Sequence, residues 1–106
     1  MSFEVEFSEM AIKDLEEIFD FIIDTTESLN LARNSIDKIR ASILNLDNFP
    51  ERFPKPNIVN HKHKNLRKMS LGAYIVYYEV NKKNEIVNVV RIFSSKRDIE
   101  NILEKI

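Results

Sequence analysis

The sequence contains no cysteine, and Gly72 is its only glycine. Without cysteine the chain can form neither a disulfide framework nor a thiolate zinc site. A single glycine excludes the glycine-rich loops that hold phosphate in P-loop and dinucleotide-binding proteins. No apolar run approaches the roughly 18–20 residues that a membrane span needs, and the acidic start, Met1-Ser2-Phe3-Glu4, has no apolar signal-peptide segment. We therefore expect a cytoplasmic protein that uses no metal, no cofactor and no membrane.

The rest of the composition is that of an ordinary globular protein. Of the 106 residues, 43% are hydrophobic and 31% charged, so residues 1–106 can bury one modest core and form a single domain. The net charge of −1 hides an uneven distribution. Residues 1–51 carry 4 basic and 12 acidic residues, which gives −8, whereas residues 52–106 carry 12 basic and 5 acidic residues, which gives +7. This division predicts a basic face for an acidic partner, unless the halves pack and their charges pair.

The N-terminal half has the periodicity of one strand followed by a helix. Residues 3–7 alternate apolar and acidic side chains, which is typical of a strand with one buried face. Ser8 suits a helix N-cap, and residues 9–26 then show apolar side chains at helical spacing. The apolar stripe consists of Ala11, Leu15, Ile18, Phe19 and Ile22.

A second helix is predicted from about residue 29 to residue 47, with Ser28 as its cap. The short gap between the helices predicts an antiparallel hairpin. Pro50 and Pro54 end the helical region because proline lacks a backbone donor. The apolar seam of this helix, at near-heptad spacing, consists of Leu29, Ala32, Ile36, Ile39, Ile43 and Leu46.

The C-terminal half predicts a loop over residues 51–63, then strands and a final helix that begins after Ser94 or Ser95. The fold class is therefore α+β, in the order β-α-α-β-β-β-α, with the helical hairpin on one face of a small sheet. The last three strands are expected to form an antiparallel meander and span residues 65–70, 72–80 and 85–93.

The strand over residues 72–80 predicts two unequal faces. The better core face consists of Tyr74, Val76, Tyr78 and Val80. The other face, which we expect to be partly open with Tyr77 exposed to a partner, consists of Ala73, Ile75, Tyr77 and Glu79.

Several short stretches occur in a fixed order along nearly the whole chain. They are Phe3-Glu4-Val5-Glu6-Phe7-Ser8, Asp14-Leu15-Glu16-Glu17-Ile18, Leu46-Asp47-Asn48-Phe49-Pro50, Leu66-Arg67-Lys68, Gly72-Ala73-Tyr74-Ile75-Val76-Tyr77-Tyr78-Glu79-Val80, Val90-Arg91-Ile92-Phe93 and Arg97-Asp98-Ile99. This ordered set resembles the RelE/ParE superfamily, the toxins of type II toxin–antitoxin modules. The resemblance implies one of two activities: RelE-like members cut messenger RNA in the ribosomal A site, whereas ParE-like members are gyrase poisons without nuclease activity.

The RelE-like reaction needs a base, an acid and cations around the scissile phosphate. Lys68 matches a strand lysine of the nuclease pattern, and Arg97 matches the arginine before the last helix. The arginine that follows the strand tyrosine is missing, because Tyr74 is followed by Ile75, and the terminal tyrosine position falls near the apolar Leu103. The resemblance is therefore closer to the ParE-like branch.

Three functional hypotheses follow. The first is a toxin of a plasmid stabilisation-like module that binds a target such as DNA gyrase without catalysis and is neutralised by a cognate antitoxin. The second is a ribosome-dependent endoribonuclease that uses Lys68, Arg97 and His63. The third is a non-toxic binding module on the same fold, and enzymatic activity stays open between them.

The candidate residues for contact with a target or an anion are Arg67, Lys68, Lys96 and Arg97. Lys96 and Arg97 precede the last helix, where cations oppose the helix dipole, so recognition explains them better than stability does. The alternative to a binding role is that Arg67 and Lys68 are exposed charges on an edge strand and that Arg97 forms a salt bridge. Arg91, within an apolar strand, is either a buried paired charge or part of the basic face.

His61 and His63 lie in a basic loop, and histidine is the side-chain type suited to proton transfer near neutral pH. They can supply an acid or a base, bind a metal as a pair, or simply be solvated. Because no acidic residue or cysteine lies near them in sequence, we expect no metal site.

An antitoxin, if present, should be an elongated acidic segment that folds on binding. The expected docking face carries Ala73, Ile75 and Tyr77, with positive charge around it. The rival expectation is that the terminal helix covers this face and buries Ile75 and Tyr77 within the monomer.

Overall fold

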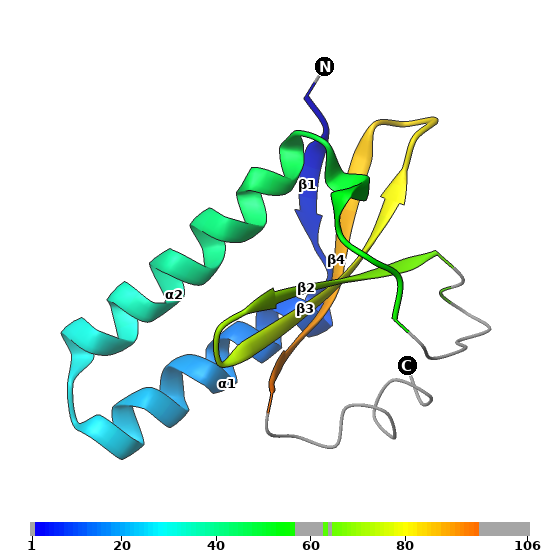
Figure 1. Ribbon diagram of the computed structural model, residues 1–106. Helices are drawn as coiled ribbons and strands as arrows, with labels where there is room; N and C mark the ends of the chain where they lie inside the picture. The colour runs from blue at the N-terminus through cyan, green and yellow to red at the C-terminus, as the bar shows by residue number, and fades with distance from the viewer. Residues whose placement is uncertain (1, 57–62, 64, 96–106) are drawn as a thin grey trace.

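The computed structural model describes residues 2–56, 63 and 65–95, which form a sheet with a helical hairpin against one face (Figure 1). The predicted α+β order is confirmed as far as the fourth strand, and the expected terminal helix lies outside the described residues. The elements are β1 (Glu4–Phe7), α1 (Glu9–Thr26), α2 (Leu29–Leu44), the 3₁₀ turns η1 (Asn45–Asp47) and η2 (Pro50–Arg52), β2 (Leu66–Leu71), β3 (Tyr74–Asn81) and β4 (Ile86–Ser94).

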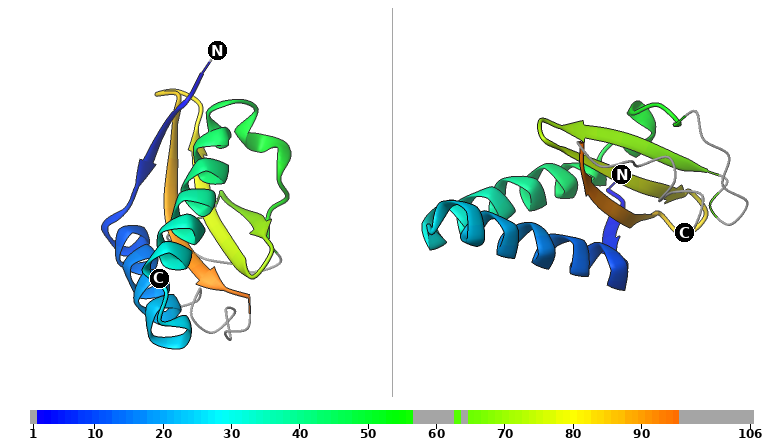
Figure 2. Two further views of the ribbon diagram at one scale, coloured as in Figure 1. Left: turned by 90° about the vertical axis from the view of Figure 1, so that its left-hand side faces the viewer. Right: turned by 90° about the horizontal axis from the view of Figure 1, so that it is seen from below.

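Both helices of the hairpin begin at a serine cap, as the sequence predicts. The Ser8 hydroxyl accepts a hydrogen bond from the Ala11 N–H at 3.0 Å, and the Ser28 hydroxyl accepts one from the Leu31 N–H at 3.1 Å. Each bond satisfies a donor that the first helical turn leaves without a partner. Figure 2 shows both helices on one side of the sheet, with their connecting turn extending beyond it. Neither α1 nor α2, the α-helices of the described part, is long and apolar enough to cross a membrane.

The helical seam differs from the prediction at its two ends. The α-helix stops at Leu44, and the chain continues to Asp47 as a 3₁₀ turn. Leu29, expected in the seam, is 47% exposed. It is the first residue of α2, and the turn before α2 extends past the sheet (Figure 2). The other seam residues are buried: Ala32, Ile36, Ile39, Ile43 and Leu46.

The four strands are ordered β1-β4-β3-β2 in the sheet. β3 pairs antiparallel with β2 and β4, which confirms the predicted meander, and β1 runs parallel to β4. The pairing of β3 with β4 shifts where Tyr77 faces Arg91 but Tyr78 faces Val89, so Val90 is an extra, bulged residue. The bulge changes which β4 side chains lie on each face.

The sheet consequently buries apolar side chains on both faces. The main core lies beneath the hairpin and includes Val76 and Tyr78, as the face prediction requires. The second cluster, on the opposite face, consists of Leu66, Tyr77, Val90 and Phe93, with Ile75 packed against it. The expectation that Tyr77 is exposed is wrong: its exposed fraction is 2%. Its ring meets the Phe93 ring edge-on, with the centroids 6.0 Å apart.

The start of α1 covers the edge of β4 where β1 has ended. The Ser8 hydroxyl donates to the Val90 carbonyl at 2.8 Å, and the Asp14 carboxylate accepts from the Ile92 N–H at 2.8 Å. The same carboxylate accepts two hydrogen bonds from the Arg91 guanidinium, at 2.8 and 3.0 Å. Arg91 is therefore a half-buried charge paired with the buried Asp14, which favours the paired interpretation over a place in the basic face.

Candidate functional site

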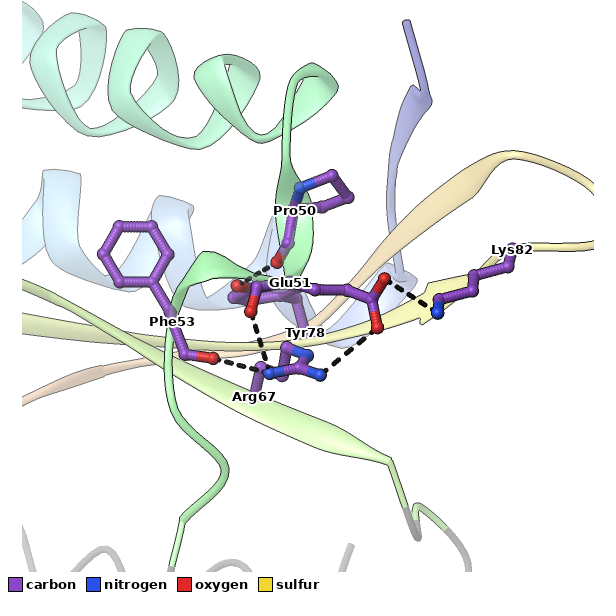
Figure 3. A network of polar contacts seen from close by, with 6 residues as sticks. All are labelled: Pro50, Glu51, Phe53, Arg67, Tyr78 and Lys82. Carbon is purple, nitrogen blue, oxygen red and sulfur yellow. Dashed lines mark hydrogen bonds and ion pairs between the residues drawn. The ribbon is translucent and has the colours of Figure 1, made fainter. Parts of the chain in front are cut away.

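Two groups of polar and charged side chains in the described chain lie around β2 and β3. One group, which we name the Arg67 cluster, is drawn in Figure 3. The Arg67 guanidinium donates to the carbonyl oxygens of Phe53 at 2.8 Å and Glu51 at 3.1 Å. The Glu51 carboxylate lies 3.4 Å from Arg67 and 3.1 Å from the Lys82 ammonium. The cluster consists of Pro50, Glu51, Phe53, Arg67, Tyr78 and Lys82.

Tyr78 is the buried member of the Arg67 cluster. Its hydroxyl donates to the Pro50 carbonyl at 2.6 Å, which fastens the chain after α2 to the central strand. Burial raises the pKa of Tyr78 to about 12, although the positive charges of Arg67 and Arg52 act to lower it. The hydroxyl therefore stays protonated at neutral pH and is not an acid or base for catalysis there.

The Arg67 cluster binds the protein to itself rather than presenting free positive charge. The Arg67 donors are used by two backbone carbonyls and a carboxylate. A hollow of about 580 Å³ beside it has mixed charge on its lining. Its charged residues are Glu51, Lys55, Arg67, Glu79 and Lys82. The basic face expected from the charge pattern is thus not uniform among the described residues.

Arg67 and Lys68 lie on opposite faces of the sheet, as their alternation predicts. Arg67 faces Tyr78 across the strand pair, on the side of the main core, whereas Lys68 faces Tyr77 on the other side. Only Lys68 thus shares a face with the second apolar cluster. Lys96, Arg97 and His61, the other candidates, lie outside the described residues.

His63 has an acidic partner that its sequence neighbours do not reveal. Its Nδ1 atom is bonded to the Glu79 carboxylate, and both side chains are half-buried. Glu79 pairs with Leu66, which lies two positions before Lys68 in β2, so Glu79 and Lys68 lie on one face of the sheet. His63 contacts Glu79 and therefore lies on that face as well. A carboxylate on one ring nitrogen orients an imidazole. Among the described residues no three metal-ligand side chains gather.

We expect Arg67→Ala to lower the free energy of unfolding by about 1–2 kcal/mol, because two carbonyl contacts and one ion pair are lost. Arg67→Lys should recover only part, since an ammonium cannot replace the planar guanidinium fork. Urea unfolding of the purified variants measures both effects. Lys82→Ala is the matched control and should cost less than about 0.5 kcal/mol, as for other exposed ion pairs. Wild-type stability in Arg67→Ala would contradict a fastening role.

Comparison with known proteins adds a family to this geometry. The family model described as the ParE toxin of the type II toxin–antitoxin system parDE matches residues 5–99. The chain belongs to the ParE toxin family. It is a toxin of a type II toxin–antitoxin system, and the predicted RelE/ParE resemblance is confirmed. No curated protein matches the ParE-family chain.

Solved structures share the fold of this ParE-family toxin at low sequence identity. A chain of the chromosomal ParDE system from P. aeruginosa is 13% identical over 88% of this chain and 96% of that one, with a TM-score of 0.73. A mutant of E. coli toxin RelE in the free state is 13% identical over 99% and 96%, with a TM-score of 0.62. A chain of the RelBE2 toxin–antitoxin complex from Mycobacterium tuberculosis is 16% identical over 89% of this chain and 99% of that one, with a TM-score of 0.60. At these identities the likeness concerns the fold alone.

Proposed function

We propose that this ParE-family toxin harms cells by binding a target protein, with DNA gyrase as the candidate, and that it has no catalytic step. The observation that carries the proposal is the ParE family match over residues 5–99. The described side chains support it. Arg67 is committed to backbone carbonyls, and the Tyr78 hydroxyl does not ionise near neutral pH. The strand position after Tyr74 holds Ile75, where the nuclease pattern has an arginine.

A cognate antitoxin is the second proposed partner. The family belongs to toxin–antitoxin systems, and several solved chains of this fold are toxin–antitoxin complexes. On the face where we expected the antitoxin, Ala73 is exposed and Ile75 is half-buried, but Tyr77 is covered. Ala73 and Ile75 therefore remain the proposed contacts, and an acidic segment would meet Lys68 on the same face.

One observation favours the ribonuclease alternative. His63 is oriented by Glu79 and lies on the same face as Lys68. An imidazole can take or give a proton near neutral pH, and an ammonium can stabilise the charge of a phosphorane. This alternative would use His63 and Lys68, together with Arg97 of the predicted set.

Two assays on the purified toxin distinguish the proposals. We expect it to inhibit DNA supercoiling by gyrase in proportion to the amount bound, and to leave ribosome-bound messenger RNA intact. Preincubation with the cognate antitoxin should restore supercoiling. Cleavage of the message by wild-type toxin that is lost in His63→Gln and Lys68→Ala would instead establish the ribonuclease. Induced expression that leaves growth unchanged would establish the non-toxic binding module.

A further inference from the structure

Phe49, between η1 and η2, has an exposure and a backbone conformation that the fold does not require. Its exposed fraction is 83%, the largest among the big hydrophobic side chains that the structure describes. Its backbone is left-handed, with φ 47° and ψ 54°, a region that residues with a bulky side chain rarely adopt. Asparagine or glycine would fit this backbone better and would expose no apolar surface. A residue that is both strained and exposed indicates a functional constraint.

The backbone on both sides of Phe49 is held firmly. The Arg52 N–H donates to the Phe49 carbonyl at 3.1 Å, and the Arg52 guanidinium donates to the carbonyls of Asn48 and Phe49. Before it, the Phe3 N–H donates to the Asp47 carbonyl at 2.7 Å. After it, the Pro50 carbonyl receives the Tyr78 hydroxyl (Figure 3). The Phe49 ring is thus presented from a fixed frame, so a partner pays little ordering entropy to bind it.

A hollow of about 480 Å³ lies beside the exposed ring. The half-buried Phe3 and the buried Pro50 give it apolar walls, and Phe49 forms one rim. The ring and hollow together offer a projecting aromatic group next to a concavity. Aromatic side chains in such settings are the residues that most often dominate binding energy at protein interfaces.

The charges around Phe49 favour a protein over a nucleic acid. Asp47 lies two positions before Phe49, and the exposed Glu4 follows Phe3, so these two carboxylates give the surroundings of the ring their negative charge. The Glu51 carboxylate is paired with Arg67 and Lys82, and Arg52 is the cation that lines the hollow. The Arg52 guanidinium is bonded to backbone carbonyls. Phosphate groups would be repelled by the carboxylates. A protein pocket with basic residues on its rim would be attracted.

We propose that Phe49 is the anchor that this toxin inserts into an apolar pocket of its protein target, a pocket rimmed by lysine or arginine. The proposal rests on the proposed function, because it assumes a toxin that acts by binding a protein. It adds the contact residue and the chemistry of the target surface. The candidate antitoxin contacts, Ala73 and Ile75, lie on β3 and the turn before it, away from η2 in the chain.

The test compares Phe49→Asn with a matched control. Asparagine accepts the left-handed backbone and removes the ring, so the variant should fold at least as stably as wild type. Phe21→Ser is the control, because Phe21 is the next most exposed aromatic residue, at 68%, and lies in right-handed α1. The measurements are growth after induced expression, gyrase inhibition, capture by the cognate antitoxin and thermal unfolding.

We expect Phe49→Asn to need at least tenfold more toxin for the same gyrase inhibition, to lose growth arrest, and to keep antitoxin capture. Phe21→Ser should behave as wild type in every measurement. The proposal would be overturned if Phe49→Asn arrested growth as strongly as the wild type, whether or not it still bound the antitoxin. It would also be overturned if the wild-type toxin cleaved messenger RNA and that cleavage required Phe49. A wild-type toxin that arrests growth without touching gyrase refutes only gyrase as target, and growth arrest still tests Phe49. A wild type that arrests nothing refutes the proposed function first, and the anchor with it.

Discussion

Asp14→Ala should lower the free energy of unfolding by about 3–5 kcal/mol, the cost typical of breaking a buried ion pair. The Asp14 side chain is 4% exposed and accepts three hydrogen bonds, two from Arg91 and one from the Ile92 N–H. Its removal leaves the half-buried Arg91 guanidinium and the buried Ile92 N–H without their acceptor. Chemical denaturation of both proteins measures the difference. A domain of this size has about 5–15 kcal/mol in total, so the variant should be close to unfolding.

Two further variants separate the charge from the hydrogen bonds. Asp14→Asn keeps an acceptor for the Ile92 N–H but removes the charge, so it should lose less than Asp14→Ala. The double variant Asp14→Leu with Arg91→Met removes both charges and fills the space with apolar groups. It should be more stable than Asp14→Ala, because no buried charge stays unpaired. Equal stability of the double variant and Asp14→Ala would show that the unpaired Arg91 charge is not what destabilises Asp14→Ala.

The features that local sequence determines were predicted well. The two serine caps and the helical periods are signals that lie within a few residues of each other, so Ser8 and Ser28 were identified without knowledge of the fold. The core face of β3 follows from alternation alone, and Tyr78 was placed correctly. The family resemblance also came from stretches that are each continuous in the chain.

The features that the sequence does not predict depend on residues that are distant from one another in the chain. Asp14 and Arg91 are 77 positions apart, and His63 and Glu79 are 16 apart, so no spacing rule pairs them. The bulge at Val90 changes which β4 side chains lie on each face of the sheet. The alternation of apolar and polar residues in the sequence does not reveal it. The covered state of Tyr77 therefore escaped prediction. The anchoring of Arg67 by Glu51 and Phe53 depends likewise on how the segment after α2 returns to β2.

Raising the pH from 10 to 12 should weaken the fold through Tyr78, by about 2–3 kcal/mol. The pKa of Tyr78 is about 12 in the folded chain and 10.0 for an unperturbed tyrosine. The raised pKa means that the folded state holds this proton when the unfolded state has lost it. Its stabilisation is complete below pH 10 and disappears as the pH approaches 12, at about 1.4 kcal/mol for each pH unit. Urea unfolding across this range measures the change.

Tyr78→Phe isolates the contribution of Tyr78 from the lysines and other tyrosines that titrate in the same range. At neutral pH the variant should be about 1–3 kcal/mol less stable than wild type, because the Pro50 carbonyl loses its buried donor. That deficit should shrink above pH 10, since the variant has no hydroxyl to ionise at this position. Near pH 12 the two proteins should therefore be similar in stability. A deficit that stays constant from pH 7 to pH 12 would mean that Tyr78 ionises equally in the folded and unfolded chains, and that burial beneath Pro50 does not protect its proton.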